Sequence, residues 1–190
     1  MTGVGGIAPQ RLVFLDECGV LTTMARRYGR SPRGQRARTK VPFGRWKRLS
    51  VLGAIGRDGF MAAMSINAAT DGATFAAYLE QVLLPVLHQR KPDAVLVMDN
   101  LRAHKTSKVQ MVLERSGFAY RYLPSYSPDP WSALRPKPIE PGWAKVKSDL
   151  RRVAARTVEA LEHALGPALD SITPQDAEGF FRHCGYSRLN

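Results

Sequence analysis

Three acidic residues of this chain are placed where they could bind divalent metal ions. Asp16 and Asp99 each follow a short apolar run, at 13–15 and 95–98, and Glu140 opens a helix-like stretch. Carboxylate oxygens are the ligands that hard ions such as Mg²⁺ prefer, so no His or Cys is needed for such a site. Two such ions can stabilise both the attacking and the leaving oxygen of a phosphodiester displacement. These residues therefore indicate metal-dependent phosphoryl transfer.

The charge of the chain favours a polyanionic partner. Its 190 residues carry 28 Lys and Arg against 16 Asp and Glu, a net charge of +12. Nucleic acid is the usual partner of such an excess, because phosphate contacts give affinity without sequence reading. The plain alternative is a basic surface that only keeps the protein in solution. Residues 18–57 contain no acid, and we expect their basic side chains to lie along DNA: Arg26, Arg27, Arg30, Arg33, Arg36, Arg38, Lys40, Arg45 and Lys47.

The elements that must position the three acids follow from the apolar pattern. Apolar, β-branched runs predict five strands, at 11–16, 49–55, 60–66, 94–98 and 119–123. Arg57-Asp58-Gly59 predicts a hairpin turn between the second and the third. Apolar stripes and capping signals predict helices at about 71–88, 105–116, 140–155, 157–171 and 174–183. The first opens at Asp71 or Gly72, Gly117 ends the second, and Thr173 caps the last. The chain is therefore expected to be a single α/β domain, a mixed five-stranded sheet flanked by helices, with extra C-terminal helices. Asp16 and Asp99 would each end a strand, the two strands being neighbours, and ligand sites form outside such ends.

The helix expected to begin at Glu140 could present both a metal ligand and phosphate contacts. Glu140 falls at the edge of the apolar stripe formed by Trp143, Val146, Leu150 and Val153. Lys147 and Arg151 project on nearly the same side of the helix, two and three turns further along. We expect them to track DNA phosphates beside the metals, although a solvated basic face is the alternative.

The cysteines and the apolar runs indicate the cellular compartment. Cys18 and Cys184 form neither a disulfide framework nor a zinc pattern, which fits a reducing cytoplasm. No charged and apolar leader opens the chain, and no apolar run approaches the roughly 18 residues of a membrane span. We therefore expect a cytoplasmic protein with no membrane partner.

Several short motifs follow one another along the chain in a characteristic order. They are Leu12-Val13-Phe14-Leu15-Asp16-Glu17; Tyr28-Gly29-Arg30; Pro32-Arg33-Gly34; Trp46-Lys47; Met98-Asp99-Asn100 with His104-Lys105; Leu123-Pro124-Ser125-Tyr126-Ser127-Pro128-Asp129; and Pro138-Ile139-Glu140 with Trp143-Ala144-Lys145. Through these motifs the chain, from Arg11 to Tyr186, resembles transposases of the insertion-sequence 630 family in the mariner superfamily.

The resemblance implies an RNase H-like catalytic domain with an Asp-Asp-Glu triad. Asp16, Asp99 and Glu140 would hold two Mg²⁺ ions, for which Mn²⁺ can substitute. The implied activity is cut-and-paste transposition of double-stranded DNA, with cleavage of the element ends and strand transfer into a target at TA. The resemblance also implies a homodimer in the active complex and a bacterial, nucleoid-associated location. Asn100 and His104 match the family's region after the second acid, where we expect DNA contacts, or for Asn100 orientation of Asp99.

Two features depart from the family. Forty residues separate Asp99 from Glu140, about six more than the family's usual spacing, and the surplus at 130–137 lies in a loop where an insertion costs little closure entropy. Asp129 and Asp149 are therefore rival third ligands. Second, no helix-turn-helix module precedes the first strand. We expect a second chain, or a second reading frame joined by a frameshift, to bind the element ends, unless the chain is a truncated remnant.

Two other functions remain open from the sequence. The first is an inactive remnant that binds DNA without cutting it, because the insertion has displaced Glu140. The second is a phosphatase resembling haloacid dehalogenases, with Asp16 as the nucleophile. Such enzymes place a second Asp two positions further on, where this chain has Cys18, so the sequence disfavours that function.

Overall fold

The computed structural model describes residues 6–44, 46–123 and 136–186. A central sheet contains the strands β1 (Leu12–Leu21), β2 (Arg48–Gly56), β3 (Gly59–Ile66), β4 (Val95–Met98) and β5 (Ala119–Tyr122). The α-helices are α1 (Gly72–Tyr78), α2 (Leu84–Arg90), α3 (Ser107–Ser116), α4 (Ile139–Val153), α5 (Val158–Asp170) and α6 (Pro174–His183). Short 3₁₀ turns at Pro9–Arg11 and Arg102–Lys105 precede β1 and α3.

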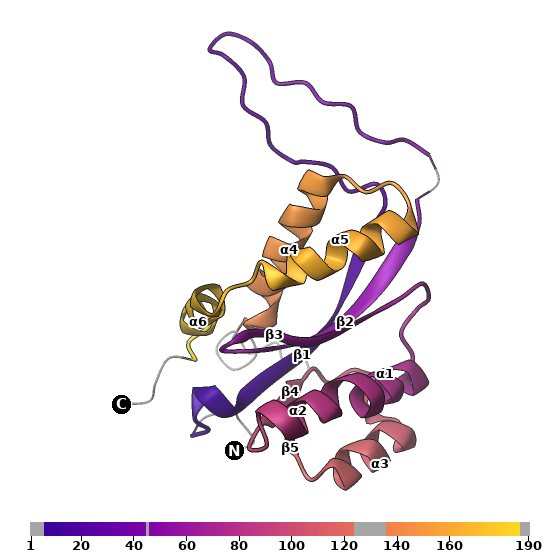
Figure 1. Ribbon diagram of the computed structural model, residues 1–190, viewed down its shortest axis with the longest axis vertical. Coiled ribbons are helices and arrows are strands. Elements are labelled where there is room, and N and C mark those ends of the chain that lie inside the picture. The colour runs from indigo at the N-terminus through magenta and orange to yellow at the C-terminus, as the bar shows by residue number, and fades with distance from the viewer. Residues whose placement is uncertain (1–5, 45, 124–135, 187–190) are drawn as a thin grey trace, which may run out of the picture.

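The sheet is mixed, and its strand order is β3-β2-β1-β4-β5. The first three strands in this order form an antiparallel unit joined in part by the predicted turn at Arg57 and Asp58, whereas β4 and β5 run parallel to β1. Figure 1 shows α4, α5 and α6 on one face of this sheet and α1, α2 and α3 on the other. The predicted fold class, a mixed five-stranded sheet flanked by helices with extra C-terminal helices, is confirmed.

The prediction that Asp16 ends its strand is wrong. β1 continues to Leu21 because it pairs with β2 over this whole stretch, to the pair of Leu21 with Arg48. What ends near Asp16 is the parallel pairing with β4, which runs from Leu12 opposite Val95 to Phe14 opposite Val97. The functional edge is therefore the end of the shorter strand β4, alongside the middle of the longer strand β1.

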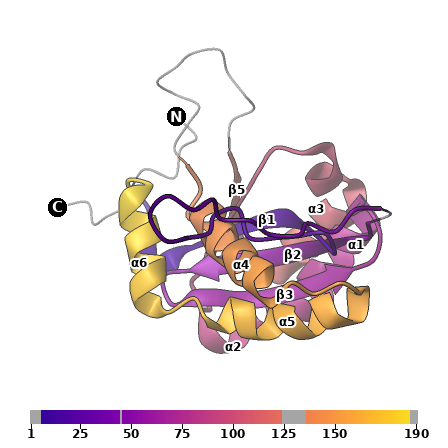
Figure 2. The same ribbon diagram turned by 90° about the horizontal axis from the view of Figure 1, so that it is seen from above.

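Alternation along β1 divides the core between the two faces of the sheet. Leu12, Phe14, Cys18 and Val20 belong to the apolar cluster that contains residues of α4, α5 and α6. Val13 and Leu15 belong to the cluster that contains residues of α1, α2 and α3. Because side chains two apart share a face, Asp16 lies on the face of α4. Figure 2, seen from above, shows α4, α5 and α6 over the strands on this side.

The helix predicted at 71–88 contains a π-helical turn, Leu79–Leu83, between α1 and α2. The backbone N–H of Leu84 donates to the carbonyl of Leu79, one residue further back than in an α-helix. Pro85 explains the interruption, because proline lacks the N–H for a regular bond and its ring crowds the preceding turn. At the start of α1 the Asp71 carboxylate accepts from the Thr74 N–H, as its capping pattern predicts.

The apolar stripe of α4 is one residue shorter than predicted. Ile139, Trp143, Val146 and Leu150 are buried, but Val153 is 60% exposed. The helix ends at Val153, and Ala154 adopts the left-handed conformation with φ 56°. That reversal turns the chain away from the sheet before Val153 can pack on it.

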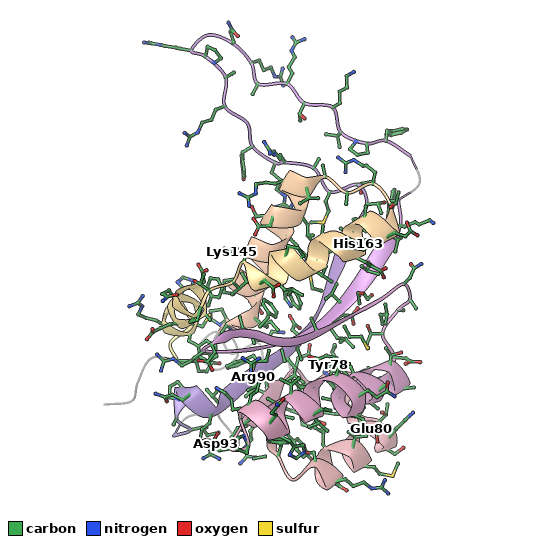
Figure 3. All side chains as sticks on the ribbon, in the orientation of Figure 1. Tyr78, Glu80, Arg90, Asp93, Lys145 and His163 are labelled. Atoms are coloured by element: carbon green, nitrogen blue, oxygen red, sulfur yellow. The ribbon has the colours of Figure 1, made fainter. Side chains whose placement is uncertain are left out.

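A long segment without strand or helix joins β1 to β2; we call residues 23–44 with 46 and 47 the arm. It protrudes far beyond α4 and α5 (Figure 1), and its side chains point outward along most of its length (Figure 3). Its base is held by Arg156, whose guanidinium donates to the carbonyls of Thr22 and Met24 at 3.0 and 2.9 Å. Gly29, Pro32, Gly34, Pro42 and Gly44 interrupt this stretch and predict a loop or a ragged hairpin; its described residues form a loop.

Two further observations concern the cysteines and the helices. Cys18 and Cys184 are both buried and form no disulfide. Within residues 6–44, 46–123 and 136–186, no helix is long and apolar enough to cross a membrane.

Candidate active site

Asp16 and Asp99 lie level with each other where β4 ends beside β1. The pairing of β1 with β4 has a constant offset of 83 residues, which places Asp16 level with Asp99 just beyond the last pair. Two residues earlier, Phe14 on β1 and Val97 on β4 both belong to the α4 cluster, and Asp99 directly follows the end of β4. The Asp99 charge acts on Asp16 and, with burial as the largest cause, raises the pKa of the Asp16 carboxyl above its usual value. The two acids therefore form a close, partly desolvated pair.

A lysine from the start of α4 lies against this pair. Lys137 Nζ is 2.9 Å from Asp16 Oδ1, and each of the two side chains is only 16% exposed. The ammonium lowers the pKa of Asp16 in opposition to burial, without cancelling the effect of burial. Its charge also lowers the pKa of Asp99. The chain thus supplies one cation of its own at the place where two carboxylates converge.

His104 holds the other carboxylate. Its Nδ1 lies 2.6 Å from Asp99 Oδ1, its side chain is 3% exposed, and its ring stacks on Phe75 at a centroid distance of 4.0 Å. The Tyr122 hydroxyl donates to the His104 carbonyl at 2.8 Å. Burial raises the pKa of Asp99, but the hydrogen bond and charge of His104, helped by Lys137, bring it below its usual value. His104 therefore faces Asp99 instead of solvent, which corrects the expectation that it contacts DNA.

Glu140 lies beside this pair without joining it. It is exposed in the first turn of α4 and lines, together with Asp16, a groove of about 430 Å³. Among the described residues, no three Asp, Glu, His or Cys side chains converge closely enough to hold a metal ion. Of the predicted trio, therefore, Asp99 acts on Asp16 through its charge, and Glu140 shares the groove with Asp16.

Asp149 and Asp129 are the rivals of Glu140 as third ligand. Asp149 accepts from Arg152 at 2.7 Å and from the Ser171 hydroxyl at 2.8 Å, so its carboxylate is committed to contacts outside the groove. Asp129, most of the surplus segment before Glu140 and the expected DNA contact Arg45 lie outside the described residues. Of the described candidates, Glu140 alone shares the groove with Asp16.

The aspartate pair fits a hard divalent cation. Its donors are carboxylate oxygens from adjacent strands, which is the donor type that Mg²⁺ and Mn²⁺ prefer. The ammonium of Lys137 against Asp16 shows that a cation is accommodated there. Asp16 and Asp99 would hold such an ion, and Glu140 would complete the ligand set from α4.

Basic side chains surround the groove. Lys147 and Arg151 line it from α4, and Arg27 lines it from the base of the arm. Burial, followed by the nearby charge of Arg27, lowers the pKa of Arg151. The other basic residues of the arm that are described are exposed, namely Arg26, Arg30, Arg33, Arg36, Arg38, Lys40 and Lys47. Asn100, directly after Asp99, is partly buried.

Sequence reasoning missed the contact between Lys137 and Asp16. The two residues are 121 positions apart, so no local periodicity could reveal the ion pair. A signal was nevertheless present, because Lys137 is a cation three residues ahead of an acid expected to bind metal.

The strand order, with Asp16 on β1 and Asp99 directly after the neighbouring strand β4, is that expected of an RNase H-like domain. A family model described as a DDE superfamily endonuclease matches residues 11–162, and the chain belongs to this family. No curated protein matches the chain in sequence.

Solved structures with the same fold include three of Mos1 transposase. A paired-end complex with a left transposon end is 17% identical over 92% of this chain and 52% of that chain, with a TM-score of 0.70. A mariner paired-end complex with Mn is 16% identical over 93% and 53%, with a TM-score of 0.68. A catalytic domain with raltegravir and Mg is 14% identical over 94% and 80%, with a TM-score of 0.63.

These likenesses establish the RNase H-like fold. The present chain spans about half the length of the Mos1 chains in the paired-end complexes. The resemblance to mariner and insertion-sequence 630 transposases is thereby confirmed at the level of family and fold.

Proposed function

We propose that this chain is the catalytic domain of a cut-and-paste DNA transposase, with Asp16, Asp99 and Glu140 as the ligands of two Mg²⁺ ions. The observation that carries the proposal is that Asp16 on β1 lies level with Asp99, just after the end of the parallel neighbour β4, and feels the Asp99 charge. Membership of the DDE superfamily endonucleases and the fold of Mos1 transposase support it. Glu140 lines the same groove as Asp16 and is the described acid best placed to complete the set.

The chemistry is one displacement used twice. When bound, divalent ions would activate the attacking oxygen and stabilise the leaving oxygen. Water is the first nucleophile and releases a 3′-hydroxyl at the element end, and this hydroxyl then attacks target DNA, by resemblance at TA. Asp16 and Asp99 hold the reacting centre on the sheet, and His104 fixes the orientation of the Asp99 carboxylate.

The basic surroundings would hold the DNA. Lys147, Arg151 and Arg27 line the groove that leads to Asp16, so a strand in the groove would meet cations on two sides. The arm reaches well beyond the sheet (Figure 1), and its arginines are exposed, so they extend this basic surface. Such contacts bind phosphates without reading bases. We further propose a homodimer as the active form, with element ends recognised by a helix-turn-helix module on another chain.

A second candidate function is a DNA-binding remnant that does not cut. It is favoured by the division of the three acids into a pair and a neighbour, and by the lysine that already neutralises Asp16. This candidate keeps salt-dependent DNA binding, because the basic groove and the arm do not depend on metal.

The experiment that tests the proposal is Mn²⁺-dependent nicking of supercoiled plasmid DNA by the full chain. We expect Asp99→Asn and Glu140→Gln each to lower nicking at least about 100-fold while the fold is kept, because each removes a charged metal ligand. Asp149→Asn is the matched control and should nick like the wild type, since Asp149 contacts Arg152 and Ser171. Full nicking by Asp99→Asn contradicts the ligand assignment. DNA binding without nicking by the wild type favours the remnant.

A further inference from the structure

Lys137 makes a contact that the proposed chemistry does not use. Its ammonium and the Asp16 carboxylate are 2.9 Å apart, and both side chains are about five-sixths buried. A lysine ammonium is strongly hydrated in water, so this degree of burial requires a close anionic partner. The Asp16 carboxylate likewise needs a nearby positive charge, because burial is the largest cause of the rise in its pKa. Each group therefore compensates the burial of the other.

The position of Lys137 also couples it to Glu140. The backbone carbonyl of Lys137 accepts the Glu140 N–H at 2.9 Å, in the turn that opens α4. Lys137 and the proposed third ligand are thus parts of one short turn facing the aspartate pair. The side chain of Lys137 reaches Asp16, whereas Glu140 lines the groove beside it.

We propose that Lys137 is the internal counter-ion of the aspartate pair, and that a divalent ion binds only as the ammonium leaves Asp16. This inference rests on the proposed function, since it concerns the same site. The carboxylate oxygen that Lys137 contacts lies on the residue expected to bind metal. A monovalent and a divalent cation placed within a few ångströms of each other in a partly buried site repel strongly. Metal binding is therefore an exchange of cations.

The exchange has a functional consequence. In the metal-free chain, the Lys137 ammonium acts on both carboxylates and so offsets the repulsion that the Asp99 charge exerts on Asp16. The site is then stable without metal, and its metal affinity is lower than that of two bare carboxylates. Lys137 in this way sets the metal concentration at which the domain becomes competent to cut.

A positioning role for Lys137 predicts the opposite sign. If the ammonium held Asp16 in the rotamer that binds metal, its removal would weaken metal binding. Lys137→Met removes the charge and keeps an unbranched side chain of similar length, so it separates the two roles. Lys137→Arg keeps a cation that can pair with Asp16.

The test is the dissociation constant for Mn²⁺, measured by isothermal titration calorimetry on the full chain without DNA. We expect Lys137→Met to tighten Mn²⁺ binding about tenfold, the equivalent of one charged hydrogen bond, and Lys137→Arg to stay close to the wild type. Lys145→Met is the matched control. Lys145 lies on α4 (labelled in Figure 3) and pairs with Asp176 at 2.6 Å, so its loss should change the affinity less than about twofold.

Each outcome bears on a separate claim. Unchanged or weaker binding by Lys137→Met overturns the counter-ion role, as does equal tightening by Lys145→Met, which would reflect net charge alone. Asp16→Asn reports on the site itself and should lose Mn²⁺ binding. If Asp16→Asn binds Mn²⁺ like the wild type, the proposed function fails at its ligand assignment, whatever Lys137 does.

Discussion

Gly53 on β2 determines how closely α4 approaches the sheet. It stands opposite Asp16 in the register of β1 and β2. A Cβ at this position would lie 2.6 Å from Cη2 and 2.7 Å from Cζ2 of Trp143, and 3.2 Å from Cε1 of Phe60. Trp143 is 5% exposed, and its ring lies 4.7 Å from that of Phe60, centroid to centroid. The indole of Trp143 is therefore packed directly over the backbone of Gly53.

Gly53→Ala should destabilise the protein and displace α4. Carbon atoms in contact are about 3.5–4.0 Å apart, so the indole must move by roughly 1 Å. Overpacking of this kind costs about 1–3 kcal/mol. For a chain of 190 residues a loss of about 2 kcal/mol lowers Tm by about 4–8 °C. Because Glu140 lies one turn before Trp143 on α4, Mn²⁺-dependent nicking should fall as well.

Urea denaturation followed by circular dichroism measures this loss. Gly56→Ala on the same strand is the matched control: its nearest neighbour is the flexible Met61 side chain at 3.2 Å, and we expect a change within about 0.5 kcal/mol. Trp143→Phe removes the two indole atoms in question, so Gly53→Ala should cost less in that background, with a coupling energy of at least about 1 kcal/mol. Additive effects, or a Gly53→Ala variant as stable as the wild type, would refute the packing argument.

Three other predictions follow from particular contacts. His104→Ala should weaken Mn²⁺ binding about 10–100-fold, measured by calorimetry, because the partner that orients Asp99 is lost; wild-type affinity would contradict this role. Asp176→Ala should lower the free energy of unfolding by about 1 kcal/mol at pH 6 by removing a capping box. Hydrogen bonds from Lys145 and Thr173 lower the pKa of Asp176 to about 2. This stabilisation is therefore present above the unfolded pKa of about 3.9 and is lost as pH falls toward 2, where urea titrations of variant and wild type should converge. Lys147→Gln and Arg151→Gln should each reduce the salt dependence of DNA binding, the slope of log K against log salt, by about 0.9 in fluorescence anisotropy if each meets one phosphate; an unchanged slope would remove that side chain from the interface.

The parts of the fold that sequence predicted are those set by local chemistry. The turn at Arg57 and Asp58, the caps at Asp71 and Thr173, and the stop at Gly117 all agree with the structure. Each depends on residues within a few positions of one another, and hairpin and capping rules describe such neighbours directly.

The parts that sequence missed depend on distant partners. The apolar pattern predicts too early an end for β1 because Glu17 and Gly19 interrupt its apolar run, whereas pairing with β2 keeps the strand extended to Leu21. The burial of His104 depends on Phe75, which lies on α1. Neither partner is visible in a local pattern, since each comes from a different element.

In the candidate site, too, local patterns are predictable from the sequence and contacts between distant residues are not. The positions of Asp16 and Asp99 followed from two apolar runs expected to be neighbours, and the register of β1 and β4 brings these residues together. Glu140 was placed correctly at the start of α4. The distance across the groove could not be predicted, because it depends on how Trp143 packs over Gly53 and on the turn that carries Lys137.

The most direct test of the proposed function is a crystal structure of the Mn²⁺-bound chain with anomalous difference maps. We predict a peak ligated by both Asp16 and Asp99, with Glu140 drawn in from α4 as a third ligand and Lys137 Nζ moved beyond ion-pair distance from Asp16. Saturating Mn²⁺ with no peak at the two aspartates, and with Lys137 still on Asp16, would contradict a metal-dependent nuclease site in this domain.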